Sequence, residues 1–308
     1  MKPKISQVVR GRFASTKWPN FHAANAFTLV ELLVVVGIVA LLGMTLMPIM
    51  AGSRAGSQSF QCLNNNRQLC AAWRMYADDF ANKIVYSADD GTQSGGNPNN
   101  YRAWTWTHMD YSASRYNYDP TVDIFIRPLW VYTSRDASIY RCPSDYSYVV
   151  AAGAARARVR TCSINLFAGG FAPPRGSPPD SPGNDGGITY ANPYRIFSKS
   201  TDLTAPGPAN TFVFIDMRPE CINWGNFAID MTGFPNQPAT YRFDQDRPGI
   251  FHNFGASISF ADGRAEIHRW QDARTAPPLP AQTQTTTAIP SPYNVDIAWL
   301  QAHSTSPK

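Results

Sequence analysis

The sequence predicts an α+β chain, with a long N-terminal helix followed by a globular head that contains β-strands. Three observations carry this prediction. Residues 32–50 are an apolar run without a charged side chain, close to the roughly 20 residues that cross a bilayer as a helix. Apolar residues then recur at helical spacing between positions 60 and 80. Two later stretches, 210–216 and 252–270, have the β-branched and aromatic composition of strands.

A basic leader, residues 1–26, precedes the apolar run. The whole chain has 27 Lys and Arg against 22 Asp and Glu, and the leader accounts for the excess because it contains five basic and no acidic residues. The rest is formally neutral, so we expect no nucleic-acid-binding face. Because a basic flank stays in the cytoplasm, a single pass would leave the head outside the inner membrane. A signal peptide cut after Ala51 is the rival interpretation, but its apolar core would normally be about 7–15 residues long.

The apolar helix carries two unusual residues. The stretch "FTLVE" at 27–31 puts Glu31 at its front, where an ionised and unpaired carboxylate costs several kcal/mol in hydrocarbon. A glutamate that simply reaches the water at the membrane boundary is the plainer alternative. Pro48 removes a helix hydrogen bond, so a bend or local melting is expected there.

This combination resembles the processing site of type IV prepilins and pseudopilins. The resemblance implies that a prepilin peptidase cuts between Ala26 and Phe27 and methylates the new amine; Ala26 stands where the family usually has Gly. It also implies that Glu31 pairs with the N-terminal amine of a neighbouring subunit, and that Pro48 occupies the family's bending position. The implied partners are the peptidase, the inner membrane and other pilin-like subunits bound through the N-terminal helix.

The second part of the predicted helix is amphipathic. We expect a helix over 27–83 that spans the membrane in its first half and packs on the head in its second. Arg67 interrupts an otherwise apolar stripe whose members, with Arg67 included, recur three and four positions apart: Phe60, Leu63, Cys70, Trp73, Tyr76 or Ala77, and Phe80.

The head is predicted over 84–270. The stretch "NTFVFID" at 210–216 predicts a strand, and the alternating "YRAWTWTHMDY" at 101–111 suggests another. "SISF" and "RAEIH" predict two strands joined in a hairpin at Asp262 and Gly263, with positive φ at both turn residues. The Pro- and Gly-rich stretch 169–187 predicts a long loop.

Nine residues separate His252 from Asp262-Gly263. This spacing, with "CLNNNRQL", "YRCPSD" and "TFVFID" in the same order, resembles the prepilin-like proteins of the H-x9-DG family. The resemblance implies a pilin-like fold, in which the long N-terminal helix packs on an antiparallel β-sheet head. It implies an architecture and leaves the role of the individual protein open.

Residues 271–308 are predicted to form a low-complexity tail. The stretch 274–292 is rich in Pro, Thr and Gln and should be flexible. The last residues, "NVDIAWLQAH", predict a final helical turn with Asn294 as its N-cap.

Five cysteines leave at least one thiol outside any intrachain disulfide. Cys62 and Cys70 are too far apart on a helix to bridge. Cys142 with Cys162 is the preferred pair in an exported head, and five reduced, buried thiols are the alternative.

No metal site and no catalytic site are predicted. His252, His268 and Asp262 resemble metal ligands only in residue type, and with Cys142 they resemble a thiol-protease set, but no local motif supports either interpretation. The turn accounts for Asp262, and a structural hydrogen bond at a strand start accounts for His252. The Asp-rich loop 180–185 is a weaker candidate for Ca²⁺ because it lacks EF-hand spacing.

The function predicted from these observations is that of a prepilin-like structural subunit of a type IV pilus or of a type II secretion pseudopilus-like filament. Such a subunit lies in the inner membrane with its head in the periplasm or in a surface filament, needs no cofactor, and is not an enzyme. The alternative is a single-pass anchored protein that binds glycans without polymerising, since 13% of the residues are aromatic. Buried aromatic residues that build a core explain the same composition, and a Cys/His hydrolase is a third interpretation.

Overall fold

The computed structural model describes residues 28–89, 102–105, 108–174, 176–178, 180–285 and 287–308, and within this set it leaves out the side chains of 43–55. The chain forms two compact units, Met1–Ala51 and Gly52–Lys308. The predicted cleavage residues Ala26 and Phe27 lie outside the described residues.

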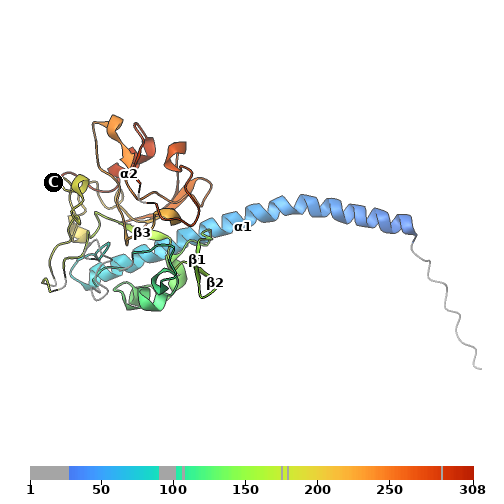
Figure 1. Cartoon of the computed structure of the whole chain (residues 1–308), viewed down its shortest axis with the longest axis horizontal. Coiled ribbons are helices and arrows are strands. Elements are labelled where there is room, and N and C mark those ends of the chain that lie inside the picture. Colours follow the sequence, from blue (N-terminus) through green and yellow to red (C-terminus); the bar gives the residue numbers. More distant parts are fainter. Residues whose placement is uncertain (1–27, 90–101, 106–107, 175, 179, 286) are drawn as a thin grey trace, which may run out of the picture. The chain divides into compact units, whose positions relative to one another are not determined.

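A single helix, α1 (Leu29–Asp79), takes the place of the predicted helix over 27–83 (Figure 1). Thr28 and Glu31 form a capping box at its start: the Thr28 amide donates to Glu31 Oε2 at 2.9 Å and the Glu31 amide donates to Thr28 Oγ1 at 3.2 Å. The backbone stays helical through Pro48, so local melting is not seen there. In the part of the chain that the structure describes, no helix is both long and apolar enough to cross a membrane. The predicted span at 32–50 extends into 43–55, whose side chains are outside that part.

The second part of α1 packs on the head. Leu69, Cys70, Trp73 and Ala77 are buried at the spacing of one helix face and belong to one core cluster with the sheet. Phe60 and Phe80 are exposed, so the predicted stripe is longer than the buried one.

The head is built around a five-stranded sheet in the order β5-β3-β4-β7-β8. Neighbouring strands are antiparallel except β3 and β5, which are parallel, so the fold is α+β with a mixed sheet. The predicted strand at 210–216 is the central strand β4, and all its residues are buried because both faces of the sheet are covered. The strand bounds are β3 Cys162–Asn165, β4 Phe212–Asp216, β5 Asn226–Phe227, β7 Gly255–Phe260 and β8 Ala265–Arg269.

The β7–β8 hairpin lies where the Asp-Gly signal predicts it. Ser259 pairs with Ala265, and the Gly263 amide donates to the Phe260 carbonyl. Of the two predicted turn residues only Gly263 has a positive φ, of 97°, so the loop is not the two-residue turn that the dipeptide favours. A three-residue loop that ends in a left-handed glycine is the common alternative for such hairpins.

Two small two-stranded sheets and short 3₁₀ helices complete the head. β1 (Tyr148–Ala151) pairs with β2 (Ala154–Ala157), and β6 (Arg242–Phe243) pairs with β9 (Ile289–Pro290). The 3₁₀ helices are Arg115–Asn117, Pro120–Val122, Ile124–Ile126, Trp130–Tyr132, Ala137–Tyr140, Thr189–Ala191, Ser200–Asp202, Pro219–Cys221, Pro238–Thr240 and Ala273–Thr275.

The suggested strand at 101–111 is not formed in the described residues of that stretch. Ala103 makes an isolated bridge with Tyr86, and Trp104 is fully buried. The Trp104 indole donates to the carbonyls of Ser87 and Gly225, both at 2.9 Å, so this segment is fixed by its side chain rather than by a ladder.

The C-terminal residues 271–308 belong to the head and do not form the predicted low-complexity tail. α2 (Val295–Ala302) buries Ile297 and Leu300 in the core. Asn294 is its N-cap, as predicted, and accepts the amides of Asp296 and Ile297. The composition of residues 274–292 does not reveal this packing, because the apolar residues that fix the C-terminal segment in the core come after that polar stretch.

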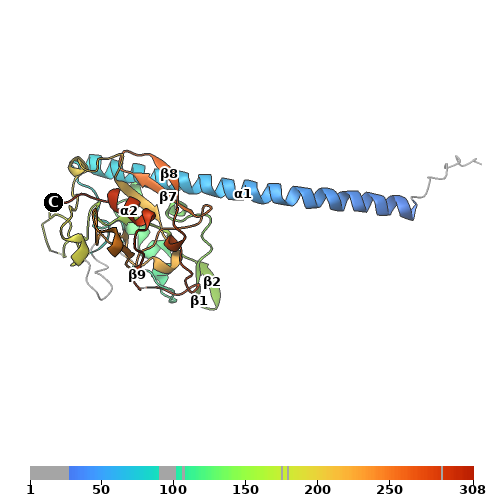
Figure 2. The same cartoon turned by 90° about the horizontal axis from the view of Figure 1, so that it is seen from above.

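The sheet separates two apolar layers. One cluster lies between the sheet and the second part of α1 and includes Trp73, Val213 and Phe214. The other lies on the opposite face with α2 and includes Ile215 and Leu300. Figure 2 shows α1 and α2 on opposite sides of β7 and β8.

Candidate functional site

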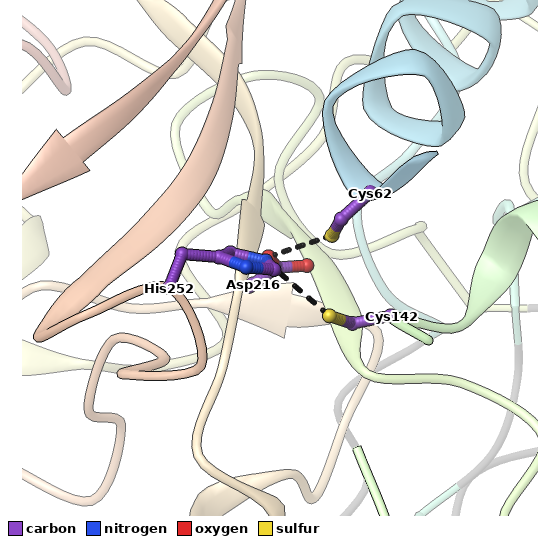
Figure 3. Close-up of side chains that lie close together, drawn as sticks. All are labelled: Cys62, Cys142, Asp216 and His252. Atoms are coloured by element: carbon purple, nitrogen blue, oxygen red, sulfur yellow. Dashed lines mark hydrogen bonds and ion pairs between the residues drawn. The ribbon is translucent and has the colours of Figure 1, made fainter. Parts of the chain in front are cut away.

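Four buried side chains from separate segments converge in the head (Figure 3). Cys62 comes from α1, Cys142 follows the 3₁₀ helix Ala137–Tyr140, Asp216 ends β4, and His252 precedes β7. Their sulfur, oxygen and nitrogen atoms all lie within 4.8 Å of one another. We call this group the Cys-Asp-His cluster.

Backbone contacts hold each member in place. The Cys142 amide donates to Thr161 Oγ1, and the Ser257 amide of β7 donates to Asp216 Oδ2 at 3.1 Å. His252 is bound into the turn before β7 because its amide donates to the Gly255 carbonyl. A side chain at Gly255 would meet the His268 carbonyl at 2.5 Å, so this close approach requires glycine.

Two of the three contacts within the cluster meet at one nitrogen, His252 Nε2. The Cys62 thiol donates to Asp216 Oδ2 at 3.1 Å. Cys142 Sγ lies 3.4 Å from His252 Nε2, and Asp216 Oδ2 lies 3.6 Å from the same nitrogen. The other ring nitrogen, Nδ1, contacts Ser59 Oγ at 3.1 Å. The imidazole is therefore oriented from outside by Ser59 and faces two acidic groups with Nε2.

The pKa values follow from burial and from these contacts. Burial raises the pKa of the Cys62 thiol well above its usual value, and Cys142 and Asp216 add to the effect. The interaction with the Cys62 side chain lowers the pKa of Cys142 against the effect of burial, and His252 contributes in the same direction. Burial opposes the charged imidazole, but the hydrogen bonds and charges of Asp216 and Cys142 raise the pKa of His252 to about 9. The cluster thus stabilises the protonated imidazole of His252.

This geometry differs from that of a thiol hydrolase. In a catalytic triad the nucleophile and the carboxylate contact different nitrogens of the histidine. Here Cys142 and Asp216 both approach Nε2. Cys142 borders a surface pocket of about 400 Å³, yet only 2% of its area is exposed. The arrangement therefore lacks the contacts of a catalytic triad, and its four donor atoms lie close enough together to surround one cation.

The remaining predicted site residues lie elsewhere. All five cysteines are free and buried, and Cys162 donates to the Tyr140 carbonyl, so the preferred Cys142–Cys162 disulfide is not formed in the structure. Asp262 accepts the Arg264 amide in the hairpin turn, as expected. His268 stacks on Trp299 with ring centroids 3.9 Å apart.

The Asp-rich loop 180–185 shows no gathering of carboxylates. Asp185 accepts the amide of Gly187 in a local turn. Within the described ranges, the one group of three or more His, Cys, Asp or Glu side chains that could hold a metal ion is the Cys-Asp-His cluster.

Sequence reasoning missed Cys62 and Asp216 as site residues, and it judged His252 to be structural. No local spacing marks the cluster, because its members are far apart in the chain. The available signal was that each member lies in one of the four stretches quoted above: "CLNNNRQL", "YRCPSD", "TFVFID" and the H-x9-DG stretch.

A second feature of the head is a pocket of about 280 Å³ with aromatic and acidic walls. Trp224 and Tyr190 provide flat apolar surfaces, and Asp244 and Asp246 provide carboxylates. Burial raises the pKa of Asp246 to about 7, and among the residues that the structure describes its Oδ1 atom has no hydrogen-bond partner. A buried acceptor without a partner at a pocket wall is suited to a ligand hydroxyl. Trp73, Trp104 and Trp270, by contrast, are buried in the core.

Comparison with protein-family models, with curated proteins and with solved structures finds nothing that matches this chain. The fold class established by the structure is α+β with a mixed sheet. The case for a function therefore depends on the residues and contacts described above.

Proposed function

We propose that this chain is a prepilin-like structural subunit of a type IV pilus or of a type II secretion pseudopilus-like filament. A prepilin peptidase removes the leader before Phe27, the first part of α1 anchors the subunit in the inner membrane, and the head stays outside. The chain is a substrate of that peptidase and has no catalytic role of its own. The observation that carries the proposal is α1, one continuous helix whose two parts have different surroundings.

The first part of α1 is apolar on every side. Residues 32–36 are all apolar and all exposed, and five consecutive residues cover more than one full helical turn. A helix that is apolar all round requires apolar surroundings. Lipid supplies them before assembly, and sister helices supply them in a filament. The exposed apolar residues of this part are Leu29, Val30, Leu32, Leu33, Val34, Val35, Val36, Ile38, Val39, Leu41 and Leu42.

Glu31 combines a local role with a role in assembly. Thr28 donates two hydrogen bonds to the Glu31 carboxylate, one from its amide and one from its hydroxyl, and both go to Oε2. Oε1 is then available to the N-terminal amine that cleavage creates on an adjacent copy. Such a pair would neutralise the carboxylate in an apolar bundle and would fix the offset between helices.

The pocket beside Trp224 supports a second function, that of an anchored binder of glycans. Its volume of about 280 Å³ suits one sugar ring, which would stack on an aromatic face and bond to carboxylate and amide groups. A binder needs the membrane anchor but has no need of cleavage or polymerisation.

A bulky residue before the cleavage site separates the two functions. Ala26→Trp should block processing by a co-produced prepilin peptidase and abolish recovery of the chain in filaments, because the small residue before the cut is lost. Ala23→Trp, the same change three positions upstream, is the matched control and should be processed and assembled normally. The readouts are electron microscopy of sheared filaments and binding of the purified chain to immobilised oligosaccharides. If the Ala26→Trp chain stays uncleaved and still forms normal filaments, the subunit function is refuted. If the unaltered chain binds sugar but forms no filaments, the binder function is favoured.

A further inference from the structure

We propose that Cys62, Cys142, Asp216 and His252 bind one zinc ion that joins α1 to the sheet of the head. This inference goes beyond the proposed function and does not depend on cleavage or polymerisation. All four residues belong to the unit Gly52–Lys308. Four arguments support it: spacing, burial, supporting hydrogen bonds and donor chemistry.

The spacing fits a tetrahedral ion. With bonds of about 2.0–2.3 Å to zinc, neighbouring ligand atoms in a tetrahedron lie about 3.3–3.8 Å apart. Here Cys62 Sγ and Asp216 Oδ2 are 3.1 Å apart, and His252 Nε2 lies 3.4 Å from Cys142 Sγ and 3.6 Å from Asp216 Oδ2. All six pairs of donor atoms lie within 4.8 Å, so the side chains must move closer by about 1 Å at most to surround a central ion.

The donors are withdrawn from water. Each of the four residues is at most 4% exposed. A buried carboxylate is costly without a positive partner, and two thiols beside it can be ionised only if a cation offsets their charge. A zinc ion would bind all four donor atoms at once. The pairwise hydrogen bonds connect these atoms only two at a time.

The surrounding contacts are those of a supported metal site. Ser59 Oγ contacts His252 Nδ1, which leaves Nε2 as the nitrogen that faces the cluster. The Ser257 amide donates to Asp216 Oδ2 and orients the carboxylate. Partners of this kind fix the ring orientation and the ligand geometry in metal sites.

The donor set selects the metal. Two sulfurs and one imidazole favour zinc over Ca²⁺ and Mg²⁺, which take oxygen ligands. Four protein ligands leave no open position, as in structural rather than catalytic zinc sites. On binding, the ion replaces the two thiol protons, which leave to solvent with any proton on the imidazole.

The consequence is a crosslink between segments that are distant in the sequence. The ion would connect α1 to the segment after Tyr140, to the end of β4 and to the turn before β7. Removal of zinc by a chelator should lower the midpoint of thermal unfolding of the unaltered chain by about 5 °C or more. A chain that lacks one ligand should not respond to the chelator.

The test uses the full chain, extracted in detergent and purified without chelator under reducing conditions. Elemental analysis should find about one zinc ion per chain, and Co²⁺ exchange should give the thiolate–cobalt charge-transfer absorption and the intense visible bands of a tetrahedral site. Cys142→Ser should weaken zinc binding about tenfold or more. Cys70→Ser is the matched control, since Cys70 is also buried but donates to the Phe260 carbonyl outside the cluster.

Three results would overturn the proposal. Zinc content and affinity could be equal in Cys142→Ser and Cys70→Ser. Co²⁺ could give no thiolate absorption with the unaltered chain. This measurement tests the zinc site even if the Cys142→Ser variant does not fold. Peptide mapping without reductant could find a Cys62–Cys142 disulfide in the chain as isolated from the membrane. None of these results bears on processing at Phe27, so they leave the proposed function standing.

Discussion

Replacing Trp73 with alanine is expected to lower the free energy of unfolding of the head by about 3–5 kcal/mol. Trp73 is 1% exposed and lies between α1 and the sheet, in the same core cluster as Phe214 and Val213. Removing the indole loses its buried apolar area and leaves a cavity, because a fixed helix and a sheet covered on both faces cannot close around it. Thermal or denaturant unfolding of the full chain in detergent measures the effect.

The matched control is Met75→Ala on the same helix. Met75 is half exposed, so its loss should change stability by no more than about 0.5 kcal/mol. If the two substitutions cost the same, the second part of α1 does not pack on the sheet as described.

Raising the pH from 5 to 8 is expected to lower stability by about 2–3 kcal/mol through Asp246 alone. Burial raises the pKa of this carboxyl to about 7, above its usual value of 3.8. The folded state therefore binds a proton that the unfolded state has already lost, so the contribution to stability is present at low pH and is lost as the pH rises through 7.

Asp246→Asn tests this prediction. Asparagine keeps an oxygen to accept the Ala228 amide but does not ionise, so the variant should lose this part of the pH dependence and should gain stability at pH 8 relative to the unaltered chain. Asp180→Asn makes the same change in charge at an exposed position and should leave the slope unchanged. A slope equal to that of the unaltered chain in Asp246→Asn would show that Asp246 ionises normally.

Local sequence signals predict the secondary structure of the head where one short pattern decides it. The Asp-Gly dipeptide gives the position of the β7–β8 hairpin, and the β-branched run gives β4. Asn294 gives the start of α2. Each of these signals acts over a few residues and needs no knowledge of the rest of the chain.

Features decided by distant contacts were predicted less well. Trp104 is withdrawn from any ladder by its two indole hydrogen bonds, although its surroundings alternate like a strand. Residues 271–308 have a low-complexity composition, yet Ile297 and Leu300 complete the core on the second face of the sheet. The parallel pairing of β5 with β3 also has no local signal.

The Cys-Asp-His cluster shows the same limit. The sequence directed attention to Cys142 and His252, but its preferred disulfide paired Cys142 with Cys162. The fold instead brings Cys142 to Cys62 through the packing of α1 on the sheet. A ligand set assembled from four separate segments becomes visible only when the segments are placed together.

The central claim is that the chain acts as a processed subunit whose new N-terminal amine pairs with Glu31 of a neighbouring copy. Mass analysis of the N-terminal peptide of the membrane-extracted chain, produced with a prepilin peptidase, tests it most directly. Because only a cleaved chain offers an amine at Phe27, we expect a peptide that begins with N-methylated Phe27. A peptide that begins at Gly52, or an intact Met1 in all of the extracted protein, would contradict it.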